Sequence, residues 1–135
     1  MANFNKFYSF VEALAEKKHD LGADTIKVAL CNATNAPVAT NAVLADLVTV
    51  DTTNLSPLTQ TLISSSQTNG TYSLVLQDLT MTASDSVGPF RYVVLYNDTA
   101  TDDDLICWYD YGSEITLNAG ETFTLDFGAT VLTLA

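Results

Sequence analysis

The sequence PFRYVVLYNDTATDDDLICWYDYGSEITLNAGETFTLDF, residues 89–127, holds most of the aromatic side chains of this chain. Three runs within it are rich in aromatic and β-branched residues, and the polar segments 98–104 and 111–114 separate them. Such runs between turn-forming segments are typical of consecutive antiparallel strands. We therefore predict three consecutive antiparallel strands in this stretch, and we interpret the rest of the chain around them.

The first and last of these runs differ in their alternation. In residues 90–96 both sets of alternating positions are largely apolar, which predicts a strand buried on both faces, with Phe90, Tyr92 and Val94 on the same face. In residues 122–127 apolar and polar residues alternate, which predicts one core face and one solvent face. The expected core residues are Phe90, Tyr92, Val94, Trp108, Phe123, Leu125 and Phe127.

The charge of the chain is strongly acidic and unevenly distributed. The 135 residues carry a net charge of −11, and 47% of them are hydrophobic, enough for one core. Residues 1–27 are neutral overall, whereas residues 28–135 contain Arg91 as their one basic residue against twelve acids. Such a surface repels a phosphate backbone, so we expect no nucleic-acid partner.

No signal peptide is recognisable, and no apolar run approaches the roughly 20 residues of a membrane span. We expect a protein made in the cytoplasm, with no membrane partner. In that setting Cys31 and Cys107 are expected to be buried thiols rather than a disulfide.

The N-terminal residues have helical periodicity. Apolar residues recur at i, i+3, i+4 and i+7 through residues 3–18, which predicts an amphipathic helix that ends near residue 20. Its apolar stripe must be covered by the sandwich or by a neighbouring subunit, and the residues expected to bind are Phe4, Phe7, Tyr8, Val11 and Leu14. We predict residues 1–22 as an N-terminal helix and 23–135 as the β domain.

Residues 33–57 form a long connection rich in Asn, Ala, Thr and Pro. Loops of this length often serve contact or function, so we predict an interaction arm there, with Val43, Leu44 and Leu47 as its apolar contacts. Beyond it, Asn69-Gly70 is a strong signal for a hairpin, and the alternation of apolar residues changes phase near Asp78, which indicates a bulge or a change of sheet. Seven or eight short strands predict a mainly β fold, a single β-sandwich of jelly-roll or immunoglobulin-like kind.

The sequence offers little catalytic chemistry. The one histidine, His19, is expected near the helix end and in solvent, and no metal-ligand or phosphate-binding motif is present. We therefore expect neither an enzyme nor a cofactor. Asp102, Asp103 and Asp104 are a weak candidate for a calcium site, since they lack the EF-hand order and resemble a solvated turn.

Several motifs carry a resemblance to a protein family. They are GPFRYVVLYND (88–98), WYDYG (108–112), ITLNAGETFTLDF (115–127), FVEALAE (10–16), DLGADTIKVAL (20–30) and VLADL (43–47). Together they resemble small proteins encoded among the structural genes of tailed bacteriophages. Among virion proteins of this size, head decoration or cement proteins are the most similar in kind: small acidic β domains, often trimeric, that clamp capsid subunits from outside.

The resemblance implies a virion protein whose partners are the major capsid protein and copies of itself, as a homotrimer, and it carries over no catalytic residue. Two alternatives stay open. One is a tail or fibre module that binds host-surface carbohydrate through Trp108, Tyr109 and Tyr111, since exposed aromatic rings stack on sugars. The other is a tail-tube or connector component.

Overall fold

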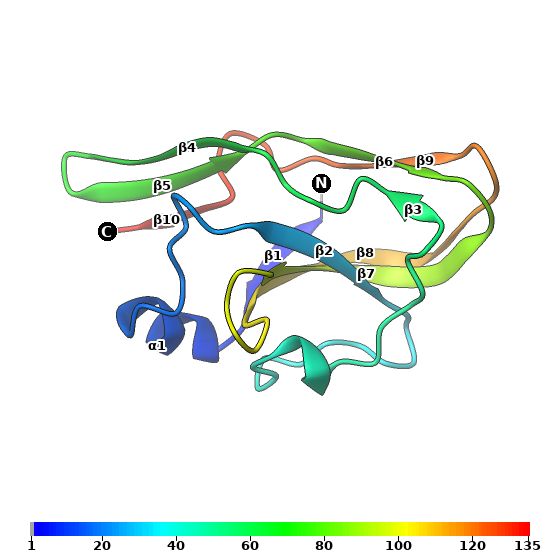
Figure 1. The fold of residues 1–135 in the computed structure, drawn as a ribbon, viewed down its shortest axis with the longest axis horizontal. Helices are drawn as coiled ribbons and strands as arrows, with labels where there is room; N and C mark the ends of the chain where they lie inside the picture. Colours follow the sequence, from blue (N-terminus) through cyan, green and yellow to red (C-terminus); the bar gives the residue numbers. More distant parts are fainter. Residues whose placement is uncertain (1) are drawn as a thin grey trace.

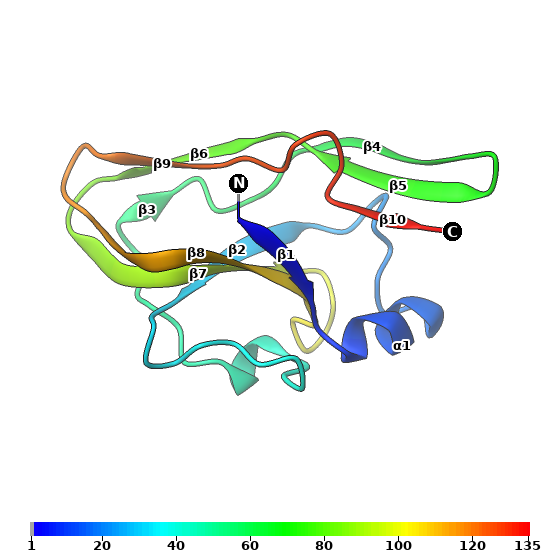
Figure 2. The ribbon, with the colours of Figure 1, turned by 180° about the vertical axis from the view of Figure 1, so that it is seen from behind.

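The computed structural model describes residues 2–135 and consists mainly of antiparallel strands in two layers (Figures 1 and 2). The predicted mainly β fold is confirmed. One layer is a four-stranded sheet with the order β1-β8-β7-β2. Its strands are β1 (Asn3–Lys6), β8 (Leu105–Leu117), β7 (Val87–Asn97) and β2 (Ile26–Cys31).

Two three-stranded sheets lie end to end and form the facing layer (Figure 1). The first has the order β10-β5-β4, with β10 (Leu132–Leu134), β5 (Thr71–Leu76) and β4 (Leu62–Thr68). The second has the order β3-β6-β9, with β3 (Leu55–Ser56), β6 (Leu79–Ala83) and β9 (Thr122–Leu125). The chain passes from one sheet to the other between β5 and β6, where Asp78 Oδ1 accepts a hydrogen bond of 3.0 Å from Phe127 N, so the phase change near Asp78 marks a change of sheet.

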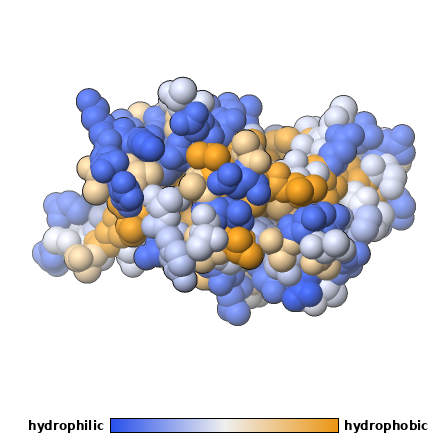
Figure 3. Space-filling model, turned by 90° about the horizontal axis from the view of Figure 1, so that it is seen from below, coloured by the Kyte–Doolittle hydropathy of each residue, from blue (hydrophilic) through white to orange (hydrophobic). Residues whose placement is uncertain are grey.

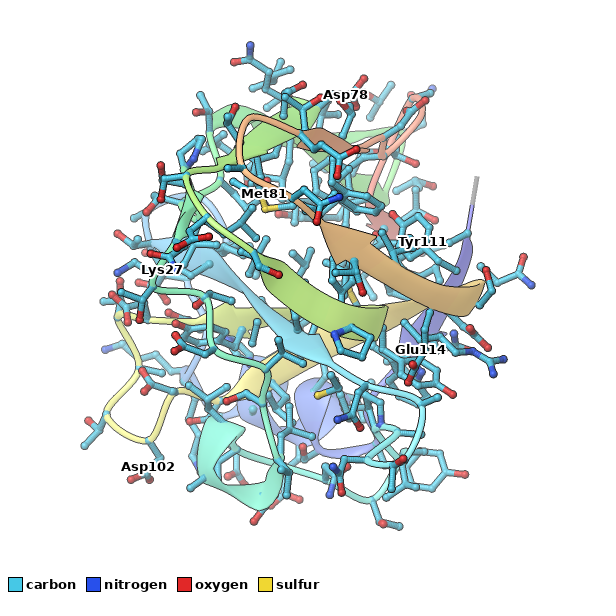
Figure 4. All side chains as sticks on the ribbon, turned by 90° about the vertical axis from the view of Figure 1, so that its right-hand side faces the viewer. Lys27, Asp78, Met81, Asp102, Tyr111 and Glu114 are labelled. Atoms are coloured by element: carbon cyan, nitrogen blue, oxygen red, sulfur yellow. The ribbon has the colours of Figure 1, made fainter. Side chains whose placement is uncertain are left out.

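Apolar side chains pack on both faces of the four-stranded sheet. The main core lies between the two layers, and fully buried Met81 projects into it (Figure 4). A second cluster lies on the outer face and contains Phe7, Ala29, Cys31, Tyr92, Val94 and Leu105. This double burial explains why both alternating sets of residues 90–96 are apolar. Of the expected core residues, Trp108 and Phe123 are only partly buried.

Phe90 and Tyr92 do not share a face, contrary to the simple alternation expected of them. The pairing of β7 with β8 shifts register on both sides of Phe90. Phe90 therefore belongs to the core between the layers, whereas Tyr92 belongs to the second cluster. Each extra residue in a strand reverses the side to which the following side chains point.

The N-terminal helix is much shorter than the periodicity predicts. Residues 3–6 are β1, which pairs with the edge of β8, and α1 spans only Ser9–Ala15. The helix ends early because Lys17 is left-handed (φ 68°), with Lys17 N bonding Leu14 O (3.4 Å) and Lys18 N bonding Ala13 O (2.8 Å). These two bonds form a Schellman motif without glycine.

The predicted hairpin at Asn69-Gly70 is present. Both turn residues have positive φ, 52° for Asn69 and 83° for Gly70, and they join β4 to β5. Two left-handed residues define a type I′ turn, whose twist matches that of the strands. Figure 1 shows this hairpin extending beyond the four-stranded sheet, above α1.

Candidate partner-binding surface

Segment 33–57 packs along the fold instead of projecting as an arm: its first part lies by the outer face of the four-stranded sheet, and its end forms β3 in the facing layer. Val50 N donates to Leu30 O (2.8 Å) and Leu105 N donates to Ala42 O (3.0 Å), which ties the segment to β2 and β8. Leu44, in the 3₁₀ turn η1 (Leu44–Asp46), packs with Leu47 on the second cluster. Two of the three predicted arm contacts, Leu44 and Leu47, are therefore partly buried by contacts within the chain.

The third predicted contact, Val43, is also anchored. It forms an isolated antiparallel bridge with Asp104 and is partly buried. Asp46 fixes the turn, because its Oδ2 accepts hydrogen bonds from Ala42 N (2.9 Å) and Val43 N (3.1 Å). These backbone donors lower the pKa of the Asp46 carboxyl.

The five N-terminal candidates divide between core and surface. Phe7 is fully buried and its ring lies 4.6 Å from that of Trp108, so it is a core residue rather than a free contact. Leu14 is partly buried against the main core. Phe4 is 39% exposed, Val11 47% and Tyr8 66%, so these three remain available to a partner.

A third exposed apolar residue, Val38, lies on the loop that the backbone of Tyr8 contacts, and no sequence pattern singles it out. Tyr8 N donates to Ala39 O (2.9 Å), which brings the backbone of Tyr8 to the residue that follows Val38, and Val38 is 52% exposed. Tyr8 and Val11 are three positions apart and so project from the same side of the helix. We call Tyr8, Val11 and Val38 the Tyr8 patch. No local pattern marks Val38, because its role depends on where the loop docks.

Figure 3 views the molecule from below, the side on which α1 and segment 33–50 lie in Figure 1. Apolar groups form several small patches there, interleaved with polar groups. Non-obligate interfaces are about as apolar as the rest of a protein's surface, so the contact residues follow from their individual exposure and not from the apolarity of this face.

The three candidate aspartates of the 98–104 loop, Asp102, Asp103 and Asp104, do not converge on a common site. Asp104 is 7% exposed and its Oδ2 lies 3.9 Å from Lys18 Nζ, whereas Asp102 is exposed at the loop (Figure 4). Asp103 has φ 54° and its carbonyl accepts a hydrogen bond from Leu44 N (3.1 Å). Within residues 2–135, no three His, Cys, Asp or Glu side chains are placed to hold a metal.

The aromatic residues of the carbohydrate alternative are divided between the two faces of β8. Trp108 packs toward Phe7 on the outer face, whereas Tyr109 is 4% exposed in the core between the layers. Tyr111 stacks edge-on with Phe123 at 5.0 Å, and burial raises the pKa of Tyr111 to about 12. The three rings therefore do not form one exposed platform.

His19 is buried, contrary to the expectation of a solvated residue. It is 5% exposed, its ring lies 5.3 Å from that of Phe10, and its Nδ1 accepts a hydrogen bond from Asn97 Nδ2 (3.0 Å). Asn97 is oriented by Thr99 N and Ala100 N, which both donate to its Oδ1. The neutral ring therefore carries its proton on Nε2, a buried atom with no partner among the described residues.

Burial lowers the pKa of His19, while Asp104 and Asp24 oppose that shift. A cleft of about 1000 Å³ opens beside this group, between α1, the overhanging hairpin and the 99–104 loop. Its lining mixes charged, aromatic and apolar side chains, among them Lys18, Asp102, Tyr72 and Leu134. His19 borders this cleft, but its Nε2 is shielded from solvent.

None of the helices in residues 2–135 is long and apolar enough to cross a membrane. The chain was compared with models of protein families, with curated proteins and with solved structures, and none of these comparisons found a match.

Proposed function

We propose that this chain is a non-enzymatic structural protein of a tailed-bacteriophage virion that decorates the head. In this proposal it binds the outer surface of the major capsid protein and stabilises the shell against internal pressure. Its two layers act as a rigid β-sandwich of jelly-roll or immunoglobulin-like kind, which presents the contact residues. The motifs quoted above supply the assignment to a phage.

The Tyr8 patch is the observation that carries the proposed contact. Tyr8, Val11 and Val38 are between 47% and 66% exposed, although Phe7 and Phe10 beside them are almost fully buried. Tyrosine is enriched at protein interfaces because it offers a large, rigid and amphipathic side chain. The backbone bond from Tyr8 to Ala39 holds the two segments together before any partner binds.

The acidic charge fits the same role, and binding in many copies strengthens a small contact. A net charge of −11 disfavours a position against packaged DNA and suits the outside of the shell. A small contact can still hold firmly when many copies bind a repeating lattice, because a second contact within one assembly forms at high effective concentration.

The test is binding to DNA-free capsids assembled from the major capsid protein of the phage that encodes this chain. The double variant Tyr8→Asp/Val38→Asp places two charges in the patch, and we expect its affinity to fall at least about 30-fold, the effect of losing a hot spot of about 2 kcal/mol. Co-sedimentation with capsids measures this.

The matched control is Leu134→Asp, which changes an apolar side chain of 38% exposure on β10, in the other layer. It should bind like the wild type. Circular dichroism establishes that both variants are folded. If the folded Tyr8→Asp/Val38→Asp protein binds capsids as tightly as the wild type, the proposed contact is refuted. If the wild-type chain does not bind capsids, the proposed function is refuted.

A further inference from the structure

Strand β4 has an unusually open position. It is the edge strand of the β10-β5-β4 sheet, and none of its residues, Leu62–Thr68, is buried. It pairs with β5 on one side only, so the N–H and C=O groups of alternate residues face outward without a strand partner. Such an edge can pair with another strand.

The other sheet edges are shorter or covered. The free side of β2 is occupied by residues that follow it in the chain. The hydrogen bonds are Val28 N to Leu58 O (3.0 Å), Gln60 N to Ile26 O (2.8 Å) and Val50 N to Leu30 O (2.8 Å). The remaining edge strands β1, β3, β9 and β10 have four, two, four and three residues. Within the described chain β4 is therefore the longest open edge.

This edge also lacks the usual protection against pairing. Natural edge strands carry Lys, other charges or Pro, which block a second chain. Here no charged residue occurs between Asp51 and Asp78, although 16% of the chain is charged, and β4 itself contains no Pro. The one bulge, between Leu62 and Ser64, is at the start of the strand and leaves Ser64–Thr68 in regular pairing.

The charge pattern selects the partner. Two copies of a chain with net charge −11 repel each other over most of their surfaces, but not where both present the neutral segment 52–77. The side chains there are small: Ser64 and Ser66 share one face (Oγ to Oγ 3.2 Å), and Ser65 bonds the Tyr72 hydroxyl on the other (2.8 Å). Small neutral side chains let two backbones approach closely.

We propose that β4 pairs antiparallel with β4 of a second copy of this chain, across a two-fold axis near Ser65. The pairing joins two three-stranded sheets into one of six strands. The pairing stops at two copies, because each copy contributes its β4 edge to the contact and that edge is then no longer free. It does not involve the Tyr8 patch, so it holds whether or not the chain binds a capsid. A two-fold dimer differs from the trimer that the phage resemblance implies.

The test is sedimentation equilibrium of the full chain over a concentration series, together with hydrogen exchange. We expect a reversible monomer–dimer equilibrium and slower exchange of the 62–68 amides at high concentration than at low. Ser66→Lys sets two like charges near the axis, and we expect it to raise the dimer dissociation constant about tenfold. Thr122→Lys is the matched control: it makes the same charge change at an exposed position of edge strand β9 and should dimerise like the wild type.

Three results overturn the proposal: a monomer at every concentration, a trimer, or a dimer in which Ser66→Lys and Thr122→Lys behave alike and the 62–68 amides are unprotected. Near-wild-type circular dichroism of both variants excludes unfolding as the cause of a lost dimer. Capsid binding is measured separately with Tyr8→Asp/Val38→Asp, so failure of one proposal leaves the other testable.

Discussion

At the scale of single residues, His19 shows how a polar group is accommodated in this core. Its ring is buried against Phe10, and one nitrogen is satisfied by Asn97, whose own carbonyl is held by two backbone donors. Asp24 and Asp104 favour the charged ring, Lys18 disfavours it, and burial outweighs them, so the pKa lies below the ordinary value of 6.5.

The lowered pKa makes stability depend on pH. Below pH 6.5 the unfolded chain takes up a proton that the folded chain resists, so we expect the free energy of unfolding to decrease as pH falls from 7 towards 5. One proton gives a slope of at most about 1.4 kcal/mol per pH unit. His19→Gln keeps an oxygen that can accept from Asn97 but cannot titrate, so its slope should be smaller.

Urea unfolding at several pH values measures both slopes. The comparison is clean, because His19 is the only histidine in the chain. Parallel curves for the wild type and His19→Gln across pH 5–7 contradict this explanation.

At the scale of elements, the start of β7 depends on a close backbone approach. Gly88 has φ 115°, and a Cβ added there lies 2.7 Å from Ile115 O. Gly112, in the partner strand β8, also has positive φ (83°), but its Cβ meets nothing within 4 Å. Alanine substitutions at the two glycines therefore distinguish the cost of a steric clash from the cost of a positive φ alone.

We expect Gly112→Ala to lower the free energy of unfolding by about 1 kcal/mol, the cost of a left-handed non-glycine residue. Gly88→Ala should lower it further, by about 2–4 kcal/mol, because two backbones must also move apart. Chemical denaturation of both variants tests this. Equal losses of unfolding free energy in the two variants show that β7 and β8 move apart at Gly88 without a free-energy cost.

The same elements show what the sequence could and could not predict. Alternation and turn signals predict most of the strands and the Asn69-Gly70 hairpin, because both depend on neighbouring residues. Residues 111–114, expected to separate two strands, instead lie within β8, and the break falls at residues 118–121. The strand after that break, β9, pairs with β6 in the facing layer and does not join β7 and β8. Helical periodicity wrongly predicts a helix at residues 3–6, because the pairing of this segment with β8 is decided by residues about a hundred positions away. The reversal at Phe90 follows from register shifts, which alternation cannot reveal.

The candidate surface was predictable in part for the same reason. Helical periodicity correctly placed Tyr8 and Val11 in an apolar segment, but it did not indicate that Phe7 is buried and Tyr8 exposed. Val38 and the buried His19 are defined by contacts across the fold, to Tyr8 through Ala39 and to Asn97. No spacing within the sequence encodes these contacts.

At the scale of the whole molecule, charge opposes compactness. The chain carries −11, and the residues beyond 27 hold twelve acids against Arg91, which is paired with Asp110 at 2.8 Å. Salt shortens the range of this repulsion from roughly 30 Å at 0.01 M to roughly 8 Å at 0.15 M. We therefore expect the melting temperature to rise over this range of NaCl.

Differential scanning calorimetry measures the rise. The variant Asp102→Asn/Glu12→Gln removes two exposed negative charges for which the structure gives no hydrogen bond or ion pair, and it should show a smaller salt dependence than the wild type. A melting temperature that falls with salt in this range shows that attractive ion pairs dominate instead.

The two buried free cysteines have a practical consequence for the intact fold. Cys31 and Cys107 are both 0% exposed, and burial raises the pKa of the Cys31 thiol to about 11 and that of Cys107 further. Thiolates are the reactive form, so we expect the two thiols of the folded chain not to react with maleimides and other alkylating probes. A cysteine introduced at any surface position then becomes the single point of attachment for a fluorophore, spin label or cargo, with no need to remove the natural pair.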